Sequence, residues 1–181
     1  ERHGWAVGHD EVIVRTEDGG LTWQRTHFEP DKQKPLLDVW FADAQNGLAV
    51  GAYGTLYVSA DGGKTWELRA FEPAAAQAGP KKSAAAASDE FVDEADLGTE
   101  FHLNAIARSQ GGALYLGGEA GHLYRSDDQG LSWRELPSPY DGSFYGIVPL
   151  DGDALLAFGL RGNLFSSRDG GQTWSALESG T

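Results

Sequence analysis

Apolar and polar residues alternate in short runs along most of the chain, most regularly between Leu36 and Phe71. Four runs there are separated by turns rich in Gly, Asn and Asp; they are LLDVWF (36–41), GLAVGA (47–52), TLYVS (55–59) and TWELRAF (65–71). A period of two over about four to eight residues is typical of β-strands with one buried face. The pattern therefore predicts an antiparallel sheet of four short strands.

The same order of runs recurs along the rest of the chain. The third unit contains the runs 102–107, 113–118, 122–126 and 132–137, and the fourth contains 144–150, 154–159, 163–167 and 173–178. The first unit lacks an initial strand and contains 4–8, 12–16 and 22–28. Four-stranded units with a period of roughly 40–50 residues are typical of β-propeller blades. The prediction is an all-β propeller with an incomplete blade at 1–35 and blades at 36–71, 101–140 and 141–181.

An eight-residue box lies between the third and fourth strands of every unit and reads Ser/Thr-x-Asp-x-Gly-x-Thr/Ser-Trp. Its copies are TEDGGLTW (16–23), SADGGKTW (59–66), SDDQGLSW (126–133) and SRDGGQTW (167–174). We expect the Asp to accept hydrogen bonds from backbone N–H groups one to three residues on. Only the second glycine is invariant, so that position is predicted to need φ > 0, and the Trp ring is predicted to be buried.

Four equivalent copies favour a structural role for the box, because a catalytic or metal-binding carboxylate is needed once or twice and not in every repeat. The residues assigned this role are Asp18, Gly20, Trp23, Asp61, Gly63, Trp66, Asp128, Gly130, Trp133, Asp169, Gly171 and Trp174. No metal site or cofactor is expected, since the histidines lack ligand-like spacing, although His102 and His122 can meet within the third unit.

Residues 72–100 interrupt the repeat. The segment is rich in Ala, Pro and Ser and then acidic, which is typical of a disordered surface loop. The alternative is a partner-binding arm anchored by Phe91, Val92 and Leu97. Because the insert links a fourth strand to the next first strand, it is expected on the face opposite the boxes.

The turns between second and third strands share that face. Propellers usually bind their partners there, by analogy between folds. Tyr53 and Arg161 fall in these turns, and Arg108 is assigned to the same region. The candidate partner-binding residues are therefore Tyr53, Arg161, Arg108 and Phe91.

Charge and composition narrow the classes of partner. The net charge of −13 disfavours nucleic acid and anionic membrane surfaces, because both select for Lys and Arg. The chain has no Cys, which excludes disulfides, thiolate zinc sites and Cys nucleophiles. No apolar run approaches the roughly 20 residues of a membrane-spanning helix, so membrane insertion is not expected.

Residues 36–66 closely resemble the repeat of the photosystem II stability/assembly factor family, within the wider group of Asp-box, or bacterial neuraminidase repeat, proteins. The shared motifs are, in order, L-x-D-V-x-F, D-x-x-x-G-x-A-V-G, G-x-L-Y and the box. The resemblance covers nearly the whole chain apart from 72–100. It implies a seven-bladed propeller, usually secreted or lumenal, that acts as a non-enzymatic assembly factor, of which this chain would be a part.

Photosynthetic members of that family bind partly assembled reaction-centre protein through an arginine-rich patch. This chain has 14 Lys and Arg against 27 Asp and Glu, which departs from that pattern. The expectation is a protein-binding scaffold that serves a membrane complex, in the periplasm or secreted.

A sialidase-like glycoside hydrolase, or a carbohydrate-binding propeller, is the competing class. Sialidase chemistry needs three arginines around the substrate carboxylate, a Tyr–Glu nucleophile pair and an Asp acid/base. Most arginines here fall on third or fourth strands or in the boxes, and the Arg-Ile-Pro signature is absent. These features favour a protein that is not an enzyme.

The chain begins within a blade, so a propeller built from it would be open. Open blade edges and faces tend to pair with another chain. We therefore expect the 181 residues alone to self-associate.

Overall fold

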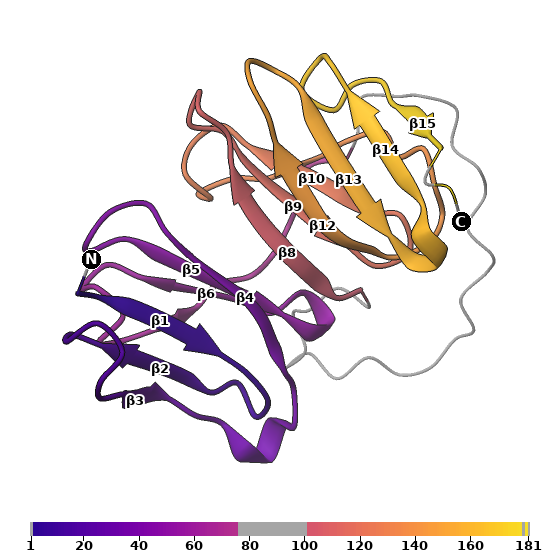
Figure 1. The fold of residues 1–181 in the computed structure, drawn as a ribbon. Helices are drawn as coiled ribbons and strands as arrows, with labels where there is room; N and C mark the ends of the chain where they lie inside the picture. The colour runs from indigo at the N-terminus through magenta and orange to yellow at the C-terminus, as the bar shows by residue number, and fades with distance from the viewer. Residues whose placement is uncertain (1, 76–100, 179, 181) are drawn as a thin grey trace.

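The computed structural model describes residues 2–75, 101–178 and 180, whose strands form four antiparallel sheets, here called blades (Figure 1). Blade 1 contains β1 (Gly4–Val7), β2 (Ile13–Thr16) and β3 (Gln24–His27). Blade 2 contains β4 (Leu36–Phe41), β5 (Gly47–Gly51), β6 (Leu56–Ser59) and β7 (Glu67–Leu68). Blade 3 contains β8 (Leu103–Arg108), β9 (Leu114–Gly118), β10 (Leu123–Ser126) and β11 (Arg134–Glu135). Blade 4 contains β12 (Phe144–Pro149), β13 (Leu155–Gly159), β14 (Leu164–Ser167) and β15 (Ser175–Leu177).

This arrangement confirms the predicted all-β propeller architecture. Three 3-10 turns complete the described elements: η1 (Pro30–Lys32), η2 (Ala52–Gly54) and η3 (Leu160–Gly162). The first strands β4, β8 and β12 lie successively against one another, and β1, the second strand of the incomplete blade 1, lies against β4, so the blades follow one another around a common side (Figure 1). Two side chains tie these strands together, since Asp38 Oδ2 accepts a hydrogen bond from Ile106 N at 2.9 Å and Asn104 Nδ2 donates to Phe144 O at 2.8 Å.

The hydrophobic core is divided among the three blade interfaces. Its main members are Ile13, Leu36, Ala49 and Tyr57 between blades 1 and 2, Leu48, Val50, Leu56, Leu103, Leu114 and Leu116 between blades 2 and 3, and Tyr115, Leu123, Phe144, Leu155 and Phe165 between blades 3 and 4. Successive side chains of a strand point to opposite faces. A middle blade therefore buries both of its faces, and β5 and β9 are buried at every position.

One face of blade 4 has no neighbouring blade among the described residues. We call it the uncovered face, and its apolar side chains are Val148, Leu156, Phe158, Leu164 and Leu177. Val148 and Phe158 are each 43% exposed, whereas Leu155 and Ala157, on the other face of the same sheet, are buried. The equivalent faces of blades 1 to 3 are covered by the next blade.

The fourth strands β7 and β11 are shorter than their alternation suggested, with two residues each. Phe71 continues the alternation but lies outside β7, because its ring is buried between blades against Tyr124 and Trp133. The chain then reaches the outer edge of blade 3, where Ala74 N donates to Trp133 O at 2.8 Å and Glu135 N donates to Ala74 O at 2.9 Å. Residues 72–75, predicted as the start of the insert, thus pair with blade 3.

The remainder of the predicted insert, 76–100, lies outside the described residues, and so do Phe91, Val92 and Leu97. Within the described part of the chain, no helix has the length and apolar character needed to span a membrane.

Candidate functional site

The box aspartates bind their own hairpins. Asp61 Oδ1 accepts hydrogen bonds from the N–H groups of Lys64 and Thr65, both at 3.0 Å, and Oδ2 accepts from the Thr65 hydroxyl at 2.7 Å. Ser59 Oγ donates to Asp61 Oδ1 at 2.9 Å and accepts from Gly63 N at 2.8 Å. Lys64 lies three residues after the Asp, within the predicted range of one to three, whereas Thr65 lies four residues after it, outside that range. The role of the first Ser or Thr as a bridge between the Asp and the second Gly was not foreseen.

Both central positions of the box are left-handed, which corrects the prediction that singled out the second. Gly62 and Gly63 each have φ +78, and in the third copy Gln129 has φ +61 beside Gly130 at φ +86. A Cβ makes such a conformation unfavourable by about 1–2 kcal/mol. Gln129 therefore adopts a conformation that Gly adopts in the other copies.

The box Trp connects neighbouring blades. Its indole N–H donates to the second Gly of its own box at 3.1–3.2 Å in three copies, and Trp66 and Trp174 also lie within reach of Thr26 Oγ1 and Pro137 O in the preceding blade. Burial depends on that preceding blade: Trp133 is 5% exposed, whereas Trp23, in blade 1, is 48% exposed. The prediction that every box Trp is buried is thus confirmed for Trp133, is wrong for Trp23, and holds only in part for Trp66 and Trp174, which are intermediate.

Acidification is expected to lower the free energy of unfolding mainly below about pH 4. The pKa values of Asp18, Asp61 and Asp169 lie at about 2, below the usual 3.8, because the N–H and hydroxyl of the Thr four residues on bind the carboxylate. A carboxyl whose pKa is lower in the folded state stabilises the fold above its unfolded pKa and stops doing so as the pH falls through its folded pKa. Urea unfolding followed by Trp fluorescence between about pH 2 and 6 measures this loss.

Asp61→Asn is the matched variant for this titration. It should be less stable than the parent at about pH 6 and lose less stability on acidification, because one of the shifted carboxyls is gone. An identical loss in the two proteins would show that the boxes do not carry the effect.

The opposite face of the propeller is formed by the turns between second and third strands; we call it the turn face. Both central residues of each turn have φ > 0, and these pairs are Asp10–Glu11, Tyr53–Gly54, Ala120–Gly121 and Arg161–Gly162. Two successive left-handed residues match the type I′ hairpin turn, whose twist suits paired strands. The first central residue of each turn is therefore a non-glycine residue in a left-handed conformation, which Asn or Gly would adopt with less strain.

Tyr53 is the aromatic centre of the turn face. Its side chain is 47% exposed, Lys34 Nζ lies 5.3 Å from the ring centroid, and the His102 ring packs edge-on at 4.9 Å. Gly54 N donates to Phe101 O at 2.9 Å, so the residue that follows the insert lies beside this turn. His102 Nδ1 is also 3.4 Å from Glu119 Oε1. The result is an exposed ring flanked by Lys34 and His102 and suited to contact with apolar groups.

Arg161 also lies on the turn face, exposed in η3 of blade 4, but Arg108 does not, which corrects its assignment. The strand β8 begins beside the turn face, where Glu119 N donates to His102 O, and Arg108 is its last residue. The turns that follow first strands contact the boxes, as when Gly62 N donates to Gln45 O. Arg108 therefore lies on the face that carries the Asp boxes, opposite the turn face; we call it the box face.

A buried carboxylate joins blades 1 and 2 beneath the turn face. Glu11 is 1% exposed, and its Oε2 accepts hydrogen bonds from Tyr57 Oη at 2.6 Å and Lys32 Nζ at 3.4 Å. Burial and this carboxylate raise the pKa of Tyr57, and burial lowers the pKa of His27, whose Nε2 lies 3.9 Å from Glu11. Glu11, Tyr57 and Lys32 thus satisfy one another, as buried polar groups usually do, whereas His27 Nε2 is buried without a hydrogen-bond partner among the described residues.

No group of three or more His, Asp or Glu side chains in the described ranges is arranged to hold a metal ion. His102 and His122 do not pair with each other, since His122 Nδ1 contacts Glu135 Oε1 at 2.9 Å. Both histidines thus have carboxylate partners of their own.

Consecutive four-stranded blades with a hydrogen-bonded Asp box at each outer hairpin define an Asp-box β-propeller. A family model described as photosynthesis system II assembly factor YCF48 matches residues 26–181, and the chain belongs to this family. No curated protein matches the chain.

Solved structures with the same fold include two YCF48 proteins and a glycoside hydrolase. YCF48 bound to D1 peptide is 24% identical with a TM-score of 0.57, and the match covers 78% of this chain and 39% of that one. YCF48 from Cyanidioschyzon merolae is 24% identical with a TM-score of 0.59, covering 80% and 40%. An ancestral GH74 enzyme is 17% identical with a TM-score of 0.67, covering 97% and 24%. The chain thus spans about two fifths of the YCF48 structures, as a partial propeller does.

Proposed function

We propose that the chain is a non-enzymatic scaffold that binds a protein partner through its turn face, as an accessory or assembly factor of a membrane complex outside the cytoplasm. The observation that carries the proposal is Tyr53, an exposed aromatic ring held on a left-handed backbone between Lys34 and His102. Strained positions and exposed aromatic side chains concentrate at binding sites. Membership of the YCF48 family, and a relative whose structure is named as bound to D1 peptide, support a protein as the partner.

The first strands support a role without catalysis. Glycoside hydrolysis needs a pair of carboxyl groups about 5–9.5 Å apart. Among the described residues, Asp38 is the one carboxylate on β4, β8 and β12, and its two oxygens accept hydrogen bonds from Val39 N and Ile106 N. The likeness to a GH74 enzyme rests on the fold alone.

Replacing Tyr53 and Arg161 together by Asn is expected to reduce recovery of the partner at least about tenfold. Asn tolerates the left-handed conformation of both positions, so the turns keep their geometry while losing the ring and the charge. The immobilised chain is incubated with a detergent extract of membranes from its source, and bound proteins are quantified by mass spectrometry.

Arg108→Asn, on the box face, is the matched control and should leave recovery unchanged. Equal recovery of the partner by the parent, the double variant and the control would show that the turn face is not the partner-binding surface. Hydrolysis of a fluorogenic sialoside or of xyloglucan above a protein-free blank would contradict the non-enzymatic assignment.

We also propose that the uncovered face of blade 4 binds another blade, supplied by a second copy when the chain is alone. Five apolar side chains there occupy the positions that a following blade covers in blades 1 to 3. Apolar sheet faces of this kind bury surface by pairing.

A further inference from the structure

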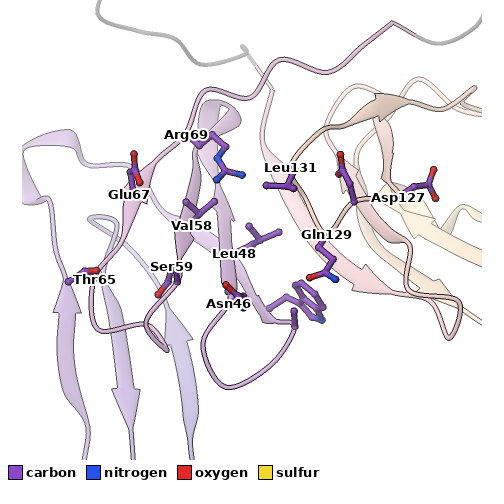
Figure 2. A pocket seen from close by; sticks show the side chains of 15 residues that line it. Asn46, Leu48, Val58, Ser59, Thr65, Glu67, Arg69, Asp127, Gln129 and Leu131 are labelled. Atoms are coloured by element: carbon purple, nitrogen blue, oxygen red, sulfur yellow. The ribbon is translucent and has the colours of Figure 1, made fainter.

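A cavity of about 630 Å³ opens between blades 2 and 3 on the box face (Figure 2). Its apolar lining includes Trp40, Leu48, Val58 and Leu131, and its charged lining is Glu67, Arg69, Asp127 and Asp128. Figure 2 shows the charged side chains distributed on both blades, with Glu67 and Arg69 on blade 2 and Asp127 on blade 3. The space is therefore amphipathic and shared between two blades.

The repeat shows what fills the corresponding space elsewhere. In each blade the residue just before the box pairs with a residue of the second strand. This cross-strand pair is Trp5–Arg15 in blade 1 and Tyr115–Arg125 in blade 3, but Leu48–Val58 in blade 2. Each arginine binds the acidic residue before its box Asp, as when Arg125 Nη2 donates to Asp127 Oδ1 at 2.7 Å. The residue at that position in blade 2 is Ala60. Blade 2 thus lacks the aromatic ring, the arginine and the carboxylate partner together.

Each of these arginines extends beneath the box of the next blade. A Cβ at Gly62 would lie 3.9 Å from Arg15 Nη2, and a Cβ at Gly170 would lie 2.5 Å from Arg125 Nη1. The box that follows blade 2 has Gln129 at this position, where Val58 leaves room for a side chain. The loss of the arginine and the change from Gly to Gln therefore occur at the same junction, and the cavity is the space between them.

We infer that this cavity binds an arginine side chain of a protein partner, together with an apolar residue next to it. The chain itself places a guanidinium in the corresponding space at two other junctions, so the space between two blades can hold one. Glu67 has no ion pair within the described part of the chain, whereas Asp127 already binds Arg125 and Asp128 binds the Ser126 and Ser132 hydroxyls of its own hairpin. Glu67 is therefore the lining carboxylate available to a cation. Trp40 supplies an aromatic face of the kind on which guanidinium groups stack. The net charge of −13 also favours a basic segment.

Tripeptides test the inference directly. Acetyl-Leu-Arg-Leu-amide is compared with the same peptide carrying citrulline, which has nearly the shape of arginine without its charge. The protein is labelled with 5-fluorotryptophan, the Trp40 signal is assigned from Trp40→Phe, and each peptide is titrated by ¹⁹F NMR. The arginine peptide should shift the Trp40 signal and bind at least about tenfold more tightly than the citrulline peptide.

Val58→Arg combined with Ala60→Asp gives blade 2 the ion pair that Arg125 and Asp127 form in blade 3. Because the new arginine fills the cavity, this variant should bind the peptide at least about tenfold more weakly. Ser166→Arg, at the equivalent position of blade 4, is the control and should bind as the parent does. Glu67→Gln keeps the shape of the cavity and should weaken binding about three- to tenfold.

Equal binding of the arginine and citrulline peptides would overturn the inference, and so would full binding by the filled variant. Binding of free arginine as tightly as the peptide would overturn the assignment to a protein side chain. Because the cavity lies on the box face, these outcomes are independent of the turn face, and the variant with Asn at 53 and 161 should bind the peptide normally.

Discussion

Gly63→Ala is expected to lower the free energy of unfolding by about 3 kcal/mol or more, through a left-handed backbone and a steric clash that add together. Gly63 has φ +78, and a Cβ there would lie 2.4 Å from Trp5 Nε1 and 3.1 Å from the Phe41 ring. The indole has little room to move, because its ring stacks on Phe41 at 3.6 Å and its N–H donates to Gly62 O at 3.0 Å. Urea unfolding at neutral pH measures the difference.

Gly20→Ala is the matched control, since Gly20 holds the same box position in blade 1. Its φ is +93, but the nearest atom to a Cβ would be Trp23 Cζ2 at 3.9 Å, because no described blade precedes it. The loss should therefore be the conformational part alone, about 1–2 kcal/mol. Equal losses at Gly63 and Gly20 would show that packing against the preceding blade does not constrain the box.

The sequence of a single repeat does not determine which glycine positions of its box are constrained. Invariance of the second glycine correctly predicted φ > 0 there, but the Gln at 129 suggested that the first position is unconstrained. The backbone is left-handed at both positions. A Cβ at Gly170 would lie 2.5 Å from Arg125 of the preceding blade, a contact between repeats, whereas a Cβ at Gly62 would lie 2.7 Å from Ala44 O of its own blade.

The strands followed closely from the alternation of apolar residues, because a period of two depends only on local backbone geometry. Burial of particular side chains did not, since it depends on the neighbouring blade. Trp23 and Trp133 hold the same place in the repeat but differ tenfold in exposure, and Phe71 leaves its strand to fill the next interface.

Strand direction decided which candidate residues share a face. Tyr53 and Arg161 lie on the turn face, as the alternation of strand directions implied. Arg108 was assigned by its nearness to a first strand, without allowing for the strand's crossing from the turn face to the box face. The inter-blade cavity had a sequence signal, namely Val58 where blades 1 and 3 have Arg, and Gln129 where the other copies have Gly, but its meaning depended on knowing that the two positions meet.

Replacing Val148 and Leu156 together by Lys is expected to convert a self-associating chain to a 19.4 kDa monomer. The two residues are cross-strand partners on the uncovered face, so both would be desolvated if another blade covered it. Burying an apolar side chain of this size contributes about 1.5–3 kcal/mol, whereas burying an unpaired ammonium opposes association. Sedimentation equilibrium between about 1 and 200 µM should show a mass that rises with concentration for the parent and stays constant for the variant.

The control replaces Leu21 and Leu68 together by Lys, which changes the net charge by the same amount as the Val148 and Leu156 variant does. Leu21 and Leu68 are 86% and 57% exposed and lie away from the uncovered face, so this variant should associate as the parent does. A parent that remains monomeric throughout the range would contradict the pairing of blade faces. Dissociation of both variants would instead indicate that charge, rather than the apolar face of blade 4, controls association.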